Sequence, residues 1–235
     1  MSESPIFRDR SKLSPRYVPE ELPHRQAQID QIVHVFSGAA KDPDGFPLTV
    51  LQIIGVAGIG KTSTVIRSSK ALEEQFAKSR LTLKTAYINL KLQGGNKFAV
   101  YRFLLEKIAP ELPAQGLSAE EMLRYLLRYL RDNKQYALII MDEIDYLIKT
   151  SKDTGIIYDL TRLNEFEPEK PCNVKGVIFI ARSTEFYNKL DPAELSTLGR
   201  VPVEFHQYTL RQVSDILESR VSLAFNPKAI GSDVI

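Results

Sequence analysis

Residues 55–62 (GVAGIGKT) constrain the fold more than any other part of the sequence. They fit the pattern GxxxxGK[ST], in which glycines let the backbone bend tightly and point its N–H groups at phosphate oxygens. Residues 48–54 (LTVLQII), just before, are short and nearly all apolar, which is typical of a buried parallel strand. Residues 62–79, just after, are expected to form a helix whose positive N-terminal end also faces the phosphates. This context predicts a phosphate-binding loop, and a turn that merely joins a strand to a helix is the alternative.

The residues of this loop have separate predicted roles. Lys61 would reach the terminal phosphates of a nucleotide and take part in catalysis, and the Thr62 hydroxyl would ligate Mg²⁺. ATP or ADP with Mg²⁺ is therefore the expected ligand set. The loop residues expected to bind the nucleotide are Val56, Ala57, Gly58, Ile59, Gly60, Lys61, Thr62 and Ser63.

A second chemical feature is a pair of acids at the end of an apolar run, residues 137–141 (ALIIM). Ligands of open α/β sheets sit at the carboxyl ends of the strands. Asp142 is predicted to hold Mg²⁺ through its water shell, and Glu143 is the candidate general base that activates water. Asp145 would be a helix cap or an additional acid of the site. The alternative is an acid pair at a helix N-terminus, which the helix dipole favours.

Strand and helix patterns alternate along the rest of the chain. This order predicts an α/β fold with a five-stranded parallel sheet flanked by helices. In residues 118–133, Ser118 and Glu121 form a capping-box signature. Pro202 limits the ladder bonding of the last strand. The further strands are expected at residues 84–89, 175–181 and 201–205, and the further helices at 26–38, 97–108, 158–166 and 210–225.

Composition excludes several classes of protein. The 235 residues contain 31 Lys+Arg against 29 Asp+Glu, so any contact with nucleic acid must be local. No apolar run approaches the ~18 residues of a membrane span, and no membrane partner is expected. Cys172 has no intrachain partner, which excludes a disulfide scaffold and favours a reducing, cytoplasmic location. The histidines, at positions 24, 34 and 206, are too scattered for a zinc site.

Taken in this order, the motifs resemble the AAA+ ATPases, specifically the archaeal origin-recognition and cell-division-control type of replication initiator. The resemblance covers residues 17–235, and its specific segments are residues 19–25 (PEELPHR) and 190–192 (LDP). It implies a nucleotide-binding base domain over residues 17–208. Residues 209–235 would begin a helical lid that stays incomplete, so the chain resembles a family member truncated within the lid. Residues 1–16, polar and of mixed charge, are expected to be a flexible arm.

The resemblance also implies a function: nucleotide-gated binding of duplex DNA at replication origins, and recruitment of the replicative helicase or of other initiator subunits. Such a protein would be associated with the nucleoid. Residues 17–25 resemble the family segment that packs against adenine, so Val18 and Arg25, with Tyr208, are expected to bind the nucleotide. For Val18, a staple against the first helix is an equally good alternative.

The family carries an insertion after the second strand that touches DNA, and residues 87–89 with the helix containing Tyr101 resemble it. Amides and charges of this segment suit contacts to phosphates. A solvated helix face is the alternative. The resulting candidates for DNA contact are Lys91, Gln93, Asn96, Lys97 and Arg102.

Two departures from the family pattern make hydrolysis doubtful. Arg182, followed by Ser183, occupies the approximate place of an asparagine that senses the terminal phosphate. The arginine could pair with phosphate or turn into a salt bridge. Ala193 stands where the family carries an arginine that reaches a neighbouring subunit's nucleotide, and the nearest arginine downstream is Arg200. The expectation is a slow ATPase, with a scaffold paralogue without turnover or another AAA+ loader as alternatives.

Overall fold

The computed structural model describes residues 6–14, 17–151, 155–199, 202–227 and 229. Within these ranges one sheet has the strand order β2-β3-β4-β1-β5, and all of its neighbouring strands are parallel. This confirms the predicted five-stranded parallel sheet. Its strands are β1 (Thr49–Ile54), β2 (Thr82–Asn89), β3 (Gln135–Asp142), β4 (Val174–Ala181) and β5 (Val203–Glu204). Val201, the first residue of the expected last strand, lies outside the described ranges.

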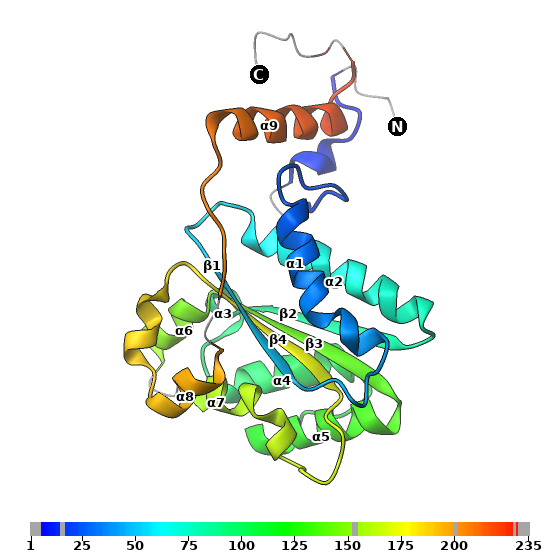
Figure 1. Cartoon of the computed structure of the whole chain (residues 1–235), viewed down its shortest axis with the longest axis vertical. Coiled ribbons are helices and arrows are strands. Elements are labelled where there is room, and N and C mark those ends of the chain that lie inside the picture. The colour runs from blue at the N-terminus through cyan, green and yellow to red at the C-terminus, as the bar shows by residue number, and fades with distance from the viewer. Residues whose placement is uncertain (1–5, 15–16, 152–154, 200–201, 228, 230–235) are drawn as a thin grey trace.

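Helices cover both faces of the sheet, which is why its central strands are almost continuously apolar. The helices α1 (Gln26–Ser37) and α2 (Lys61–Lys78) lie on one face, and α4 (Lys97–Ile108) and α5 (Ala119–Asp132) lie on the other (Figure 1). Successive residues of β3 divide accordingly, with Leu138 in the core under α1 and α2 and Ile139 in the core under α4 and α5. The sheet thus separates two hydrophobic cores.

The longer helices agree with the sequence patterns. The capping box is present, because Ser118 Oγ accepts from the Glu121 N–H and the Glu121 carboxylate accepts from the Ser118 N–H. The helix expected at residues 158–166 instead begins earlier as α7 (Gly155–Thr161) and ends in a 3₁₀ turn (Leu163–Glu165). Three helices were not predicted, since four to seven residues show no helical repeat: α3 (Leu90–Gln93), α6 (Ile144–Thr150) and α8 (Pro192–Thr197). The other 3₁₀ segments are Arg10–Leu13, Gly38–Ala40 and Thr184–Lys189.

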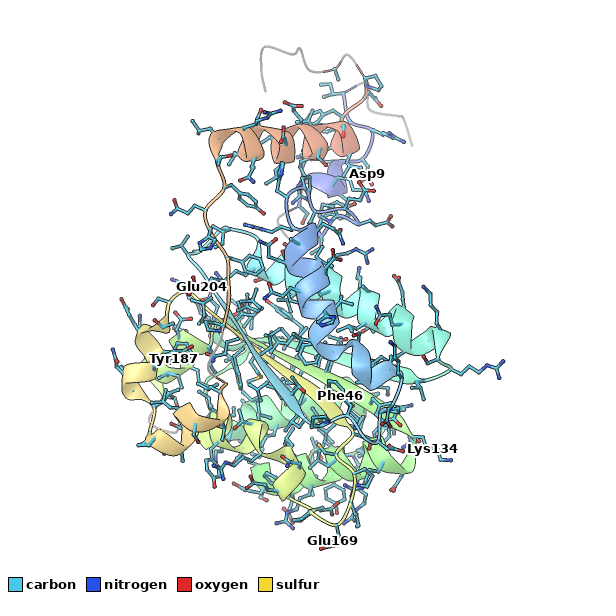
Figure 2. The ribbon with its side chains drawn as sticks, viewed as in Figure 1. Asp9, Phe46, Lys134, Glu169, Tyr187 and Glu204 are labelled. Atoms are coloured by element: carbon cyan, nitrogen blue, oxygen red, sulfur yellow. The ribbon has the colours of Figure 1, made fainter. Side chains whose placement is uncertain are left out.

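The helix α9 (Leu210–Ala224) stands away from the sheet, at the end of the segment that follows β5 (Figure 1). Residues 6–14 pack against its far end, so the expectation of a flexible arm is wrong for them. Phe7 pairs with Phe225 in an antiparallel bridge, and their ring centroids are 4.9 Å apart. Asp9 lies beside α9, at the opposite end of the molecule from Lys134 and Glu169 (Figure 2). Residues 1–5 and 15–16 of the expected arm lie outside the described ranges.

The register of the sheet brings four strand ends to one edge. Asn89 pairs with Asp142, Asp142 with Ile180, and Ile54 with Ala181. The loops that follow β1, β3 and β4 therefore start side by side, and this edge carries the predicted chemical residues. None of the helices in the described ranges is both long enough and apolar enough to cross a membrane.

Candidate nucleotide-binding site

The glycine-rich loop lies between β1 and α2, as its pattern predicts. Gly58 and Gly60 have φ values of +82° and +85°, a left-handed conformation that side chains strongly disfavour. Gly60 is also crowded, because a Cβ atom there would lie 3.1 Å from the Tyr208 hydroxyl. It immediately precedes α2, so the loop leads straight into the helix N-terminus. Both glycines are thus required by the shape of the loop.

The Lys61 side chain folds back over this loop. Its Nζ donates to the carbonyl oxygens of Gly55 at 2.6 Å and Val56 at 2.8 Å. Burial lowers the pKa of Lys61, and the nearby Asp142 and Glu143 carboxylates oppose that effect. The ammonium group therefore lies at the mouth of the loop, where phosphate oxygens can replace the two carbonyls.

Asp142 is the point at which three elements meet. Its Oδ2 accepts hydrogen bonds from the Thr62 hydroxyl at 2.7 Å and from the Tyr87 hydroxyl at 2.9 Å. Its Oδ1 accepts from the Glu143 N–H at 2.8 Å. Burial, with a further effect of Asp142, raises the pKa of Tyr87, so its hydroxyl stays a donor. Tyr87 was not predicted as a site residue, although its place two residues before the end of β2 puts it at this edge.

A carboxylate beside a hydroxyl suits Mg²⁺, which takes one or two protein oxygens and completes its shell with water and phosphate. Thr62 and Asp142 are the residues that would hold it. Among the described residues, no group of three or more His, Cys, Asp and Glu side chains could hold a metal ion. A magnesium ion at Thr62 and Asp142 would therefore take its other ligands from water and phosphate. Asp145, which is 7% exposed, lines the same hollow, and its Oδ1 has no hydrogen-bond partner in the described part of the chain.

Glu143 and Arg182 form an ion pair at this edge. Arg182 donates from Nη2 at 2.8 Å and from Nε at 3.1 Å to Oε2 of Glu143. Of the two expectations for Arg182, the structure shows the salt bridge. Ser183 does not line the hollow; its Oγ accepts from the Glu185 N–H at 3.4 Å and begins the 3₁₀ turn Thr184–Lys189. The phosphate-sensing role of Ser183 stays a prediction.

Two adjoining hollows share Gly58, Gly60 and Ser63. The polar one is lined by Ala57, Gly58, Gly60, Lys61, Thr62, Ser63, Asp142, Glu143, Asp145, Ile180, Ala181 and Arg182. The more apolar one is lined by Pro19, Leu22, Pro23, Arg25, Gly58, Gly60, Ser63, Thr64, Tyr208, Ile216, Ser219 and Arg220. The polar lining of the first hollow suits phosphates, and the more apolar lining of the second suits a flat ring. Val18 lines neither of them and borders a separate surface hollow with Glu20 and Arg67, so its contact with the nucleotide stays a prediction.

Arg25 has a structural role within the second hollow. It is 5% exposed, and its Nη2 donates to the Ile59 carbonyl oxygen at 2.7 Å and to that of His206 at 3.4 Å. Its guanidinium carbon lies 3.9 Å from the Tyr208 ring centroid. Nearby, His24 is bonded to Asp215 of α9 at 2.7 Å. These contacts join the phosphate-binding loop to the segment that leads to α9. The α9 residues that line the second hollow, which no sequence pattern indicated, are Ile216, Ser219 and Arg220.

Most of the DNA-contact candidates have partners within the chain. The Gln93 side chain accepts from the Asn89 N–H, Asn96 caps α4, and Lys97 lies 3.0 Å from the Asp159 carboxylate. Arg102 pairs with Glu106 at 2.7 Å. Lys91 is exposed on α3, next to Leu92, which is 81% exposed.

At the place of the missing family arginine, the short helix α8 begins with a capping box. Asp191 accepts from the Glu194 N–H at 2.7 Å, and Glu194 is 2% exposed. This segment therefore turns a carboxylate inward. Arg200, the nearest arginine downstream, lies outside the described ranges.

A phosphate-binding loop that follows β1, an acid at the end of β3 and the strand order 2-3-4-1-5 define a P-loop nucleotide-binding domain of the α/β class. Residues 48–190 match the family model described as "AAA domain". The chain therefore belongs to the AAA family.

Its relatives within that family include archaeal ORC1-type DNA replication proteins. It is 34% identical to ORC1-type DNA replication protein 1 of Sulfurisphaera tokodaii, over 100% of this chain and 56% of the relative. The corresponding protein of Aeropyrum pernix is 32% identical, over 99% of this chain and 58% of the relative. The chain thus spans just over half the length of these relatives.

Solved structures of ORC proteins have the same fold as this chain. The Aeropyrum pernix ORC1 protein in complex with DNA matches with a TM-score of 0.85 and 32% identity, over 99% of this chain and 58% of that one. The Aeropyrum pernix ORC2 protein in its ADPNP and ADP complexes matches with a TM-score of 0.85 at 23% identity, over 94% of this chain and 57% of that one, which shows the shared fold.

Proposed function

We propose that the chain binds ATP with Mg²⁺ and hydrolyses it slowly. The observation that carries the proposal is the 2.7 Å hydrogen bond between Thr62 and Asp142, which are 80 residues apart in the sequence. Through this bond, two oxygen groups that suit Mg²⁺ lie side by side, next to Lys61 and the glycine-rich loop. Mg²⁺, when bound, neutralises charge on the phosphates during transfer. Lys61 would hold the terminal phosphates, and the second hollow, with Tyr208, would take the base.

Hydrolysis would need a base that removes a proton from the attacking water, and Glu143 is the carboxylate placed for it. Wild-type chain and Glu143→Gln are compared in single-turnover hydrolysis of radiolabelled ATP, with Glu185→Gln as a control. Glu185 is exposed and lies outside the hollow, so the control loses the same charge nearby. We expect at least a ~100-fold loss for Glu143→Gln and none for Glu185→Gln. Equal rates for all three would exclude Glu143 as the base.

A second candidate is a nucleotide-binding scaffold without turnover. Two observations favour it: the ion pair that engages Glu143 with Arg182, and the buried Glu194 near the position at which the family has an arginine. Stoichiometric nucleotide binding, with no phosphate release above the background in the same experiment, would establish this alternative.

We also propose that the chain is the nucleotide-controlled part of a replication initiator, which binds origin DNA and joins the helicase or other initiator subunits at the nucleoid. The similarity to ORC1-type proteins supports this, as does the DNA complex of the Aeropyrum pernix ORC1 protein. Within the chain, α3 and the start of α4 offer the surface, with Lys91 as its exposed cation.

Binding of a fluorescent duplex at several salt concentrations tests the DNA proposal. Lys91→Glu is compared with Lys41→Glu, an exposed lysine in the loop at the opposite edge of the sheet. We expect salt-sensitive binding that Lys91→Glu weakens and Lys41→Glu leaves unchanged. Lys91→Glu should also lower the salt dependence of binding, because each lost phosphate contact reduces it. The same loss in both variants would point to a diffuse charge effect and not to a surface on α3.

A further inference from the structure

Helix α6, which follows Glu143, was not predicted from the sequence, yet it lies beside the segment expected to contact DNA. Because Asn89 pairs with Asp142, the residues that follow β2 and β3 start next to each other at the same edge of the sheet. The helices α3 and α6 begin there and are in contact (Figure 1). The register of these two strands thus adds a helix to the surface expected on α3 and α4.

Two contacts show how α3 and the loop after it lie on α6. Lys91 Nζ is 5.9 Å from the centroid of the Tyr146 ring. The backbone of Gly95 is also close to α6, since a Cβ atom there would lie 3.4 Å from Leu147 Cδ1 and 4.0 Å from Thr150 Oγ1. The surface is therefore continuous from α3 along the whole of α6, a helix of seven residues.

The outward side of α6 carries positive charge. Lys149 is exposed and forms no ion pair with a carboxylate in the described part of the chain. Tyr146, the aromatic neighbour of Lys91, is 36% exposed. Asp145, the acid of α6, is 7% exposed and lines the nucleotide hollow. The helix thus turns its acid inward and its cation outward, and α3, beside it, contains a lysine and no acid.

The candidate cations of α4 are less available to a phosphate. Lys97 lies 3.0 Å from the Asp159 carboxylate, and Arg102 is paired with another carboxylate at 2.7 Å. A phosphate that approached either cation would also approach its carboxylate and be repelled by it. Of these four cations, Lys91 and Lys149 are the two without a carboxylate partner among the described residues. The expected DNA contact therefore turns from the far part of α4 toward α6.

The chemistry of this surface fits a nucleic-acid backbone. Half or more of the hydrogen bonds between proteins and DNA go to phosphates and sugars, and lysine and tyrosine side chains are among the donors. Lys91 and Lys149 supply compact positive charges, and Tyr146 adds a hydroxyl. The exposed Leu92 would also suit a protein partner. The DNA complex of the Aeropyrum pernix ORC1 protein, 32% identical to this chain, favours nucleic acid over an acidic protein.

We propose that α6 is part of the DNA-binding surface, and that Lys149 and Tyr146 contact phosphates of the same duplex as Lys91. The inference rests on the proposed function, because it requires that the chain binds duplex DNA. It goes further by placing part of the contact on the helix that follows β3, next to the nucleotide site. This short helix then presents Asp145 to the nucleotide hollow and Lys149 to the DNA.

The test measures binding of a fluorescently labelled duplex to the full chain over a range of salt concentrations. Wild type is compared with Lys149→Gln, Lys91→Gln and the double variant. Each lost phosphate contact should lower the slope of log Kd against the logarithm of the salt concentration by about 0.9. Near about 0.15 M salt this corresponds to about fivefold weaker binding. The two losses should add in the double variant, because each lysine contacts its own phosphate.

Tyr146→Phe separates the hydroxyl from the charges. It removes a hydrogen-bond donor and leaves every charge in place. Binding should therefore weaken about threefold, while the salt slope stays at the wild-type value. A lower slope in this variant would mean that the substitution displaces Lys91 from the duplex, and the proposed contact of the Tyr146 hydroxyl would then be wrong.

Two further variants locate the surface. Lys134→Gln removes an exposed charge just before β3, at the opposite edge of the sheet, and should bind as wild type does. Arg102→Gln tests the far part of α4 and should also keep the wild-type slope. A wild-type slope in Lys149→Gln, or an equal loss in Lys134→Gln, would overturn the inference. If wild type shows no salt-dependent binding to duplex DNA, the proposed function itself fails.

Discussion

Tyr87, two residues before the end of strand β2, donates a 2.9 Å hydrogen bond to Oδ2 of Asp142, in the paired strand β3. This is the same oxygen that accepts from Thr62. A tyrosine that a P-loop pattern does not include thus fixes the orientation of the carboxylate proposed to hold Mg²⁺ water.

Tyr87→Phe should therefore weaken the magnesium dependence of nucleotide binding. Partners that orient a metal ligand typically contribute about 10–100-fold to metal affinity. We expect the Mg²⁺ concentration for half-maximal ATP binding to rise about tenfold, while ATP binding without Mg²⁺ stays the same. Tyr125→Phe, which changes an exposed tyrosine on α5, is the matched control. An unchanged Mg²⁺ titration in Tyr87→Phe would show that Thr62 and the Glu143 N–H orient Asp142 without help from Tyr87.

Arg25→Lys should destabilise the chain and weaken nucleotide binding together. A lysine cannot reproduce the bond to the Ile59 carbonyl and also stack on Tyr208, and a buried carbonyl left unpaired costs about 1–3 kcal/mol. Urea unfolding measures the first effect, and calorimetry with ADP measures the second. Arg211→Lys, exposed on α9, should change neither. Normal stability with weakened ADP binding would mean that Arg25 contacts the nucleotide directly.

Gly176→Ala should destabilise the sheet without affecting the nucleotide site. A Cβ atom at this residue of β4 would lie 2.4 Å from Phe36 and 2.6 Å from Leu138, and such overpacking typically costs about 1–3 kcal/mol. Adding Phe36→Leu should restore part of the loss by making room. Urea unfolding of the single and double variants provides the check; additive losses would show that the clash with Phe36 is not the cause.

Lys175→Met should change how stability depends on pH. Lys175 is 3% exposed, its Nζ donates to the Cys172 carbonyl at 2.6 Å, and burial lowers its pKa below the usual 10.5. Above the lowered value the unfolded chain binds more protons than the folded one. The free energy of unfolding of wild type should therefore gain a rising contribution toward pH 10.5.

In Lys175→Met that contribution is absent, and the variant should be the more stable of the two at pH 7. Urea unfolding of both proteins from pH 7 to 10 measures the difference, which should shrink as pH rises. A constant difference would show that Lys175 has the same pKa in both states.

The parts of the fold that could be predicted are those that depend on residues close together in the sequence. Continuous apolar runs identified the buried strands, because both faces of the sheet are covered, and Ser118 with Glu121 marked a helix start. The phosphate-binding loop was predictable because glycine is the residue that most readily adopts the left-handed conformation found at Gly58 and Gly60. In each case the signal lies within a few consecutive residues.

What the sequence did not predict depends on partners distant along the chain. Arg182 had two plausible anions, and only the adjacency of β3 and β4 selects Glu143. Val18 lies in a proline-rich segment without a helical or strand repeat, so nothing in the pattern indicates which of its neighbours face the hollow. Phe7 packs on Phe225, which is far away in the sequence, so no local pattern indicated that the N-terminal segment packs there.

The contacts between the N-terminal segment and α9 couple the position of this helix to the second hollow. Besides the Phe7–Phe225 bridge, Arg220 donates to the carbonyl oxygens of Lys12 at 2.9 Å and Tyr17 at 3.2 Å. These bonds fasten the chain to α9 before Pro19 and Pro23, which line the second hollow, and the bond between His24 and Asp215 fastens it after them. A rotation of α9 would therefore move these prolines as well. It would widen or narrow the second hollow, which is proposed to take the base.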